Sequence, residues 1–224
     1  MIKVIIAGVD EAGRGPVIGP MVLTVASIHK NDEEKLLELG VDDSKVLTPV
    51  KRKQLFVKLK SLLLEQNSFE LTAKEIDSLR LRHSLNEIEA MKIALILNEL
   101  KQKPDIVFVD SPDVVQENFS LRIKKYLNFK TIIKSEHKAD SKYVIVSSAS
   151  IIAKVLRDNK IFELSKVYGE IGSGYPADEK TIAFIRKWLK THSKLPEIVR
   201  MSWDTTKNLL NEKYQKKLTE YDVK

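Results

Sequence analysis

The most informative segment of the chain is Gly8-Val9-Asp10-Glu11-Ala12-Gly13-Arg14-Gly15, in which two acids follow a short apolar run. The pattern over residues 3–9 predicts a buried strand. Two carboxylates directly after such a strand are costly unless positive charge compensates them. A divalent cation could supply that charge, since Mg²⁺ prefers hard oxygen ligands. A solvated turn at the strand end is the alternative, and on this pair alone the two interpretations are balanced.

The glycine spacing of the same segment resembles two nucleotide-binding motifs, and both fail. Gly8 and Gly13 frame four residues as in a phosphate-binding loop, but that motif continues with Lys and then Ser or Thr. Here Arg14 and Gly15 follow, and two acids inside the loop would repel a phosphate. A dinucleotide fingerprint beginning at Gly13 fails because the third glycine has the wrong spacing.

Two further acids, Asp110 and Asp140, follow predicted strands. Taken singly, Asp110 fits a turn residue and Asp140 fits a helix N-cap. Strand ends in an open sheet converge where ligands bind, so together with Asp10 and Glu11 these acids favour a carboxylate cluster. Such a cluster could hold two divalent ions about 4 Å apart for in-line attack of water on a phosphodiester.

Short apolar runs separated by turn residues predict an α/β chain without internal repeats. Expected strands cover residues 3–9, 21–28, 69–73, 105–109 and 130–134. Expected helices begin at Thr48-Pro49 and at the capping box Ser84–Glu87, the latter running through Lys101, and others cover about 141–167, 178–191 and 204–214. Because the strands lie in the first 135 residues, we expect a sheet domain followed by a helical subdomain.

Composition limits the class of protein. The 224 residues suffice for one or two domains, and 38 Lys and Arg against 31 Asp and Glu give a net charge of +7, which suits an acidic partner such as nucleic acid. The absence of cysteine excludes disulfides, thiol nucleophiles and Cys-based metal sites. The longest uncharged stretch, Gly15–Ile28, is too short for a membrane span, which needs about twenty apolar residues. We therefore expect a cytoplasmic protein.

Tyr175 stands between Gly174 and Pro176 in a predicted loop. An exposed tyrosine there fits equally a stacking platform for a base or sugar and a structural turn residue. The histidines show no metal-ligand spacing, and the lysine runs at 51–53, 124–125 and 216–217 are typical of solvated helix faces.

Seven short motifs follow one another along nearly the whole chain. They are Asp10-Glu11-Ala12-Gly13-Arg14-Gly15-Pro16 with Gly19-Pro20; Asp43-Ser44-Lys45 with Leu47; Val109-Asp110-Ser111; Lys138-Ala139-Asp140; Ser148–Val155 with Arg157-Asp158; Gly172-Ser173-Gly174-Tyr175-Pro176; and Val199–Trp203. In these residues the chain resembles type 2 ribonuclease H (ribonuclease HII), most closely its archaeal members.

The resemblance implies a ribonuclease H-like mixed sheet flanked by helices, with a catalytic domain over 1–175 and a helical C-terminal subdomain over 176–224 packed on it. It implies an endonuclease that hydrolyses the RNA strand of RNA–DNA hybrids and incises 5′ of single ribonucleotides in duplex DNA, leaving 3′-hydroxyl and 5′-phosphate ends. The four acids, Asp10, Glu11, Asp110 and Asp140, match the family's catalytic ligands for two divalent ions, Mg²⁺ or Mn²⁺.

The same resemblance assigns the substrate contacts. Gly13, Arg14 and Gly15 match the motif that senses the ribose 2′-hydroxyl, and Tyr175 matches the tyrosine that supports it. Lys45 lies in a matching motif and is assigned a substrate contact. A monomer is the family's usual state; a replication clamp stays open as a partner, although no clear clamp-binding motif is present.

Two other functions compete with this one. A ribonuclease H-like nuclease that resolves DNA junctions would use similar acids, and cleavage of a substrate without ribonucleotides would distinguish it. A basic RNA-binding or scaffolding domain is supported only by the net charge of +7 and leaves the acids unexplained.

Overall fold

The computed structural model describes residues 3–41 and 47–221. The chain divides into two compact units: unit 1 is drawn from Met1–Ala12, Val22–Glu70 and His83–Arg157, and unit 2 from Gly13–Met21, Leu71–Arg82 and Asp158–Lys224. The expected helical subdomain over 176–224 lies wholly in unit 2. Unit 2 also takes in three earlier stretches of chain, so its limits differ from the expected division after residue 175.

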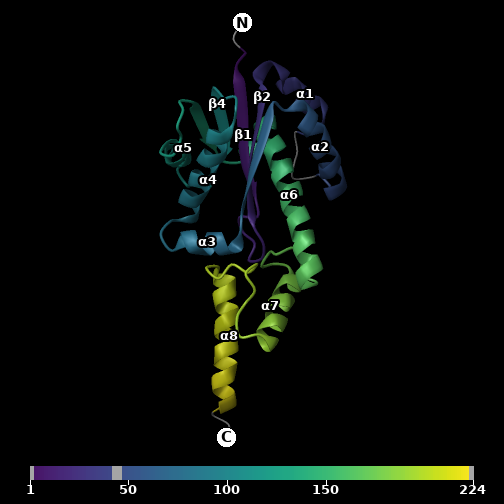
Figure 1. Ribbon diagram of the computed structural model, residues 1–224, viewed down its shortest axis with the longest axis vertical. Helices are drawn as coiled ribbons and strands as arrows, with labels where there is room; N and C mark the ends of the chain where they lie inside the picture. The colour runs from purple at the N-terminus through teal and green to yellow at the C-terminus, as the bar shows by residue number, and fades with distance from the viewer. Residues whose placement is uncertain (1–2, 42–46, 222–224) are drawn as a thin grey trace. The chain divides into compact units, whose positions relative to one another are not determined.

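Unit 1 contains a five-stranded mixed sheet with the strand order β3-β2-β1-β4-β5. Figure 1 labels β4, β1 and β2 of this sheet. The strands are β1 (Ile5–Ala12), β2 (Met21–His29), β3 (Glu65–Leu71), β4 (Ile106–Asp110) and β5 (Ile132–Glu136). β1 pairs antiparallel with β2 and parallel with β4, and β4 pairs parallel with β5. The expected α/β fold with a mixed sheet is confirmed, and β1 is its central strand.

Helices cover the sheet and build the second unit. Unit 1 has α1 (Glu33–Glu38), α2 (Pro49–Leu62), α4 (Leu85–Glu99), α5 (Gln116–Lys124), the 3₁₀ helices η1 (Lys30–Asp32) and η2 (Ala139–Ser141), and α6 (Val144–Tyr168) as far as Arg157. Unit 2 has α3 (Ala73–Arg80), the rest of α6, α7 (Glu179–Thr191) and α8 (Asp204–Tyr221). None of the helices described is long and apolar enough to cross a membrane.

The core of unit 1 lies between the sheet and α2 with α6. Leu55 and Leu59 of α2 and Ile145 of α6 share a buried cluster with Ile6 of β1 and Phe108 of β4. The alternate strand residues, among them Ala7, Val9, Val107 and Val109, are also buried. Since successive strand residues point to opposite faces, both faces of the sheet are covered. α5 contacts α4 and β5.

Unit 2 has a core of its own. Val17, Phe184, Ile185, Val199 and Leu209 are buried there, and they come from the segment after β1, from α7, from the segment after it and from α8. An isolated antiparallel bridge joins Ile18 to Val199.

The first strand is longer than predicted, and this changes where the acids lie. β1 continues to Ala12 because its antiparallel pairing with β2 continues through Asp10, opposite Thr24, and Glu11, opposite Leu23. The two acids are therefore strand residues, and the prediction that they follow the strand is wrong.

Several other boundaries differ from the prediction. β3 covers Glu65–Leu71, because Thr72 and Glu75 form a full capping box that starts α3, a helix that was not predicted. α1 and α5 were not predicted either. Ser84 caps α4 as expected, but only half of its predicted capping box exists: the Glu87 carboxylate binds Arg122 and Tyr126 instead. α4 ends at Glu99, two residues before Lys101.

Candidate active site

Asp10 and Asp110 lie next to each other in the sheet of unit 1. The parallel register pairs Val9 of β1 with Val109 of β4, and the two acids directly follow these residues in their strands. Asp10 lies on the same face of β1 as Gly8, and Gly8 faces the α6 backbone so closely that a Cβ atom there would come within 2.4 Å of Ile145. The sheet register thus places both carboxylates on the face that α6 covers.

The Asp10 carboxylate is buried, with 7% of the residue exposed. Its Oδ1 accepts a hydrogen bond of 2.8 Å from the Glu11 backbone N–H, and Ser150 of α6 also bonds to the carboxylate. Burial raises its pKa well above the usual value of 3.8, and the negative charges of Glu11 and Asp110 raise the pKa further. A group with this shift is held in its charged form only if positive charge is supplied.

A backbone hydrogen bond joins Asp110 to the segment that holds Asp140. The Asp110 Oδ1 accepts from the Ala139 N–H at 2.7 Å. Ala139 begins η2, which contains Asp140, and Asp140 is 6% exposed. Lys138 enters this turn in the left-handed conformation, with φ of 54°. Because α6 starts only at Val144, the alternative of Asp140 as the N-cap of α6 is wrong.

The carboxylate oxygens of the four acids are the type of ligand that a hard divalent cation prefers. In unit 1 the backbone brings Asp10, Glu11 and Asp110 close enough for their charges to interact, with Asp140 next to a residue that binds Asp110. Within residues 3–41 and 47–221, no group of three or more carboxylate or histidine side chains is arranged to hold a metal ion. The residue types therefore fit Mg²⁺ or Mn²⁺. In the described residues, however, their side chains do not converge on one point as the ligands of a bound ion would.

Neither Ser150 nor Lys154 was predicted to be a site residue. Ser150 bonds to Asp10, and the Lys154 Nζ donates to the Ser150 Oγ at 2.9 Å. Residues four apart share one face of a helix. The signal that could have found them is a serine and a lysine at this spacing on a helix expected to cover the acidic strand ends.

In unit 2 the structure brings together the glycine motif and Tyr175. Gly13 has a φ of 88°, which favours glycine, and a Cβ atom on Gly15 would lie 3.9 Å from the Tyr175 Cε1. The Gly174 carbonyl accepts from the Val17 N–H at 2.8 Å, so the loop carrying Tyr175 is bonded to the segment after the motif. Tyr175 is 42% exposed, as a residue that contacts a ligand requires.

The start of α7 holds the Tyr175 loop in place. Asp178, the N-cap of α7, accepts from the Ser173 N–H at 2.6 Å, and this bond and that from the Ser173 hydroxyl lower the pKa of Asp178. Thr181 accepts from the Gly174 N–H at 2.9 Å. Lys45, the remaining predicted substrate contact, lies outside the described residues.

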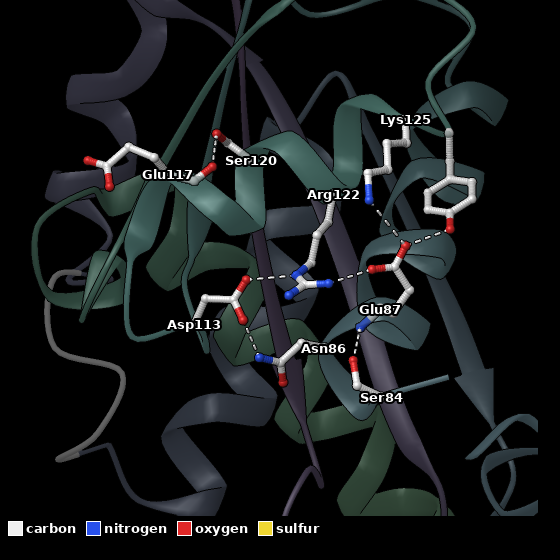
Figure 2. Close-up of polar contacts among 9 residues, drawn as sticks. Ser84, Asn86, Glu87, Asp113, Glu117, Ser120, Arg122 and Lys125 are labelled. Carbon is white, nitrogen blue, oxygen red and sulfur yellow. Dashed lines mark hydrogen bonds and ion pairs between the residues drawn. The ribbon is translucent and has the colours of Figure 1, made fainter. Parts of the chain in front are cut away.

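An ionic cluster fixes the chain just after Asp110 (Figure 2). Arg122 of α5 lies between two carboxylates: its Nη1 donates to Glu87 at 2.7 Å and its Nε to Asp113 at 2.9 Å. The Tyr126 hydroxyl donates to Glu87 at 2.6 Å, and Asn86 donates to Asp113. Hydrogen bonds from Tyr126 and Arg122 lower the pKa of Glu87. The cluster anchors the turn that follows the β4 acid to α4 and α5.

The fold is that of the ribonuclease H class of nucleases. Bst-RNase HIII has the same fold, with a TM-score of 0.78 at 19% identity over 95% of this chain and 71% of that one. The crystal structure of ribonuclease H2 from Pyrococcus horikoshii matches with a TM-score of 0.89 at 47% identity, covering 94% of this chain and 99% of that one.

The family is shown by sequence as well. The family model "Ribonuclease HII" matches residues 7–206, and the ribonuclease HII of Pyrococcus horikoshii is 47% identical over 211 residues, which are 94% of each chain. Ribonuclease HII of Archaeoglobus fulgidus, solved in a complex with PCNA, matches with a TM-score of 0.82 at 36% identity over 90% of this chain and 96% of that one. The chain belongs to the ribonuclease HII family and is a type 2 ribonuclease H, as its motifs predicted.

Proposed function

We propose that the protein hydrolyses the RNA strand of RNA–DNA hybrids and incises 5′ of single ribonucleotides in duplex DNA, leaving 3′-hydroxyl and 5′-phosphate ends. The observation that carries this proposal is that Asp10 and Asp110 directly follow the paired residues Val9 and Val109 in adjacent parallel strands, with Asp110 bonded to the turn that contains Asp140. Family membership supports the same activity.

Asp10, Glu11, Asp110 and Asp140 are the residues that would hold two Mg²⁺ or Mn²⁺ ions. Bound there, such ions supply an activated water and charge stabilisation for the leaving oxygen. The chain itself orients the ligands: Ser150 and the Glu11 N–H bind Asp10, and the Ala139 N–H binds Asp110. Each of these hydrogen bonds uses one lone pair of a carboxylate oxygen and restricts rotation of the carboxylate. The orientation of the lone pairs left for a metal ion is thereby fixed.

Recognition of the ribonucleotide falls to the loop in unit 2. The 2′-hydroxyl is the group that distinguishes RNA from DNA at one position. Gly13, Arg14 and Gly15 would contact the sugar; of these, Gly15 is exposed, so that a sugar can approach its backbone closely, and Tyr175 lies against it. Lys45 remains a predicted contact with the substrate.

The partners follow from the substrate and from one relative. A hybrid, or a DNA duplex with an embedded ribonucleotide, is the nucleic-acid partner. The Archaeoglobus fulgidus relative in a complex with PCNA supports a replication clamp as a protein partner to test by co-purification. A monomeric, cytoplasmic enzyme acting in ribonucleotide excision remains the prediction.

The decisive experiment is cleavage of three end-labelled duplexes in Mg²⁺ and in Mn²⁺. One carries a single ribonucleotide, one is a long RNA–DNA hybrid and one is a DNA junction without ribonucleotides. We expect incision 5′ of the ribonucleotide, cuts along the hybrid RNA, no cut in the junction, and no activity with excess chelator. Cleavage of the junction would support the competing resolving nuclease, and binding without any cleavage would support the scaffolding domain.

A further inference from the structure

The side chain of Arg200 is fully buried in unit 2, and its hydrogen bonds converge on one loop. Nη2 donates to the Gly13 carbonyl at 2.6 Å, Nη1 to the Arg14 carbonyl at 2.9 Å and Nε to the Gly19 carbonyl at 3.1 Å. Only a guanidinium offers donors in a rigid planar fork that can serve three carbonyls at once.

Trp203 holds the next carbonyl of the same loop. Its indole Nε1 donates to the Gly15 carbonyl at 3.1 Å, and the Arg200 guanidinium lies 4.7 Å from the centroid of its ring system. Arg200 and Trp203 together therefore bind all three carbonyls of the Gly13-Arg14-Gly15 motif.

The segment that carries these two side chains is itself anchored. The Arg200 N–H donates to the Val17 carbonyl at 2.8 Å. Asp77 of α3 accepts from the Met201 N–H at 2.7 Å and from the Ser202 N–H at 2.9 Å. The backbone that carries the Arg200 and Trp203 donors is thus fixed by its own hydrogen bonds, and these donors orient the loop of Gly13-Arg14-Gly15.

Hydrogen bonds to the carbonyl groups also fix the direction of the N–H group in each of the same peptide units. In a trans peptide the C=O and N–H groups point in opposite directions. With the carbonyls of Gly13 and Arg14 turned toward Arg200, the N–H groups of Arg14 and Gly15 are turned away from it. The positive φ of Gly13, 88°, is part of this arrangement.

We propose that Arg200 and Trp203 are positioning residues, which orient the peptides of Gly13, Arg14 and Gly15 and thereby set the preference for a ribose 2′-hydroxyl. This inference rests on the proposed function, since it assumes that the motif contacts the ribonucleotide. Neither side chain needs to touch the substrate, because both act through the backbone.

The test compares two tryptophans of unit 2 that each donate one indole hydrogen bond to a backbone carbonyl. Trp203→Phe removes the bond to Gly15, and the matched control Trp188→Phe removes a bond of 3.0 Å to the Lys194 carbonyl. For each variant we measure kcat/KM on a duplex with one ribonucleotide, the inhibition constant of an all-DNA duplex as competitor, and the thermal midpoint.

Trp203→Phe should lower kcat/KM about three- to tenfold, the value of one hydrogen bond, with the inhibition constant of the DNA duplex unchanged. Trp188→Phe should change neither. Arg200→Lys, which keeps the charge but cannot reach three carbonyls, serves as a second variant with the same expectation. The inference is wrong if Trp203→Phe behaves like Trp188→Phe, or if it weakens binding of the DNA duplex as much as it weakens incision. If the unaltered enzyme does not incise at all, the proposed function itself fails.

Discussion

The Asp10 carboxylate combines deep burial with two acidic neighbours. Glu11 and Asp110 both raise its pKa in addition to the effect of burial, so ionising this carboxyl in the folded protein costs free energy unless positive charge is supplied. A folded-state pKa above the unfolded value destabilises the fold at every pH above that unfolded value. We expect such a residue to be retained for function at a cost in stability.

Asp10→Asn should therefore separate activity from stability. We expect cleavage to be nearly abolished while hybrid binding survives, and the thermal midpoint in chelator to rise, because Asn removes the cost of burying an acid that ionises readily only in the unfolded chain. Addition of Mn²⁺ should raise the midpoint of the unaltered protein more than that of the variant, since a bound ligand stabilises the folded state by mass action. Near-normal turnover of the variant in Mg²⁺ would exclude Asp10 as a metal ligand.

Replacement of Tyr175 should also affect activity without affecting stability. Tyr175→Ala removes an exposed ring that lies against Gly15 but leaves the Asp178 and Thr181 bonds to its loop intact. Incision at a lone ribonucleotide should fall at least about tenfold, the order of a base-stacking contact, with an unchanged thermal midpoint. Unchanged incision would show that Tyr175 is a structural turn residue.

Single residues were predictable where chemistry alone selects them. Acids beside an apolar strand and an aromatic between Gly174 and Pro176 stand out in the sequence. Arg200 lies in the quoted motif Val199–Trp203, but the motif does not reveal its role, because that role depends on carbonyls that precede it by more than 180 residues. Backbone acceptors carry no sequence signal, so contacts of this type emerge only from the fold.

At the scale of elements, β1 and α6 approach each other at Gly8. A Cβ atom there would lie 2.4 Å from the carbonyl carbon and oxygen of Ile145, which is closer than atoms can pack. Gly8→Ala should destabilise the fold by about 1–3 kcal/mol or more, the cost of overpacking a core. Thermal or denaturant unfolding measures this. Gly15→Ala is the matched control for stability, since its Cβ would make an ordinary contact at 3.9 Å.

The cluster that joins α4, α5 and the turn after β4 predicts a pH dependence. Hydrogen bonds from Tyr126 and Arg122 lower the pKa of Glu87 below its usual 4.5, so the stabilisation is complete above that value and is lost as the pH falls through the lowered pKa. Glu87→Gln should cost about 1–2 kcal/mol at pH 7, and the difference should shrink in unfolding curves below pH 4.5. An equal difference at all pH values would contradict this.

The control for that prediction is an exposed ion pair. Glu170 and Lys180 lie 2.6 Å apart with side chains 72% and 67% exposed. Water screens such a pair, so Glu170→Gln should change stability little at any pH.

The starts of helices were predictable where the sequence contains a local capping residue. The capped start of α2 at Thr48-Pro49 is confirmed, and α7 begins after its N-cap Asp178 within one residue of the predicted start. The end of β1 was missed because pairing with β2, a tertiary interaction, carries the strand through two acids. Glu87 was assigned to a capping box because the sequence cannot reveal that Arg122 competes for its carboxylate.

At the scale of the whole molecule, the net charge of +7 is unevenly distributed along the chain. α2 alone contains four lysines and Arg52 but no acid. Lys53 and Lys60 are both exposed and lie seven residues apart, so they share one helix face about 10 Å apart along the axis. The lysine run interpreted as a solvated face therefore belongs to a longer basic row.

Hybrid binding should weaken steeply with salt, because every phosphate neutralised by a cation releases a counterion. If the basic row of α2 contacts the duplex, Lys53→Gln together with Lys60→Gln should reduce the slope of log affinity against log salt by about two, at roughly 0.9 for each lost phosphate contact. Lys180→Gln, which removes a lysine already paired with Glu170, is the control and should leave the slope unchanged. Titrations between low and moderate salt with the Asp10→Asn variant, which should bind without cutting, provide the measurement. Equal slopes for the α2 variant and the control would show that Lys53 and Lys60 do not contact phosphate and that the basic row is a solvated helix face.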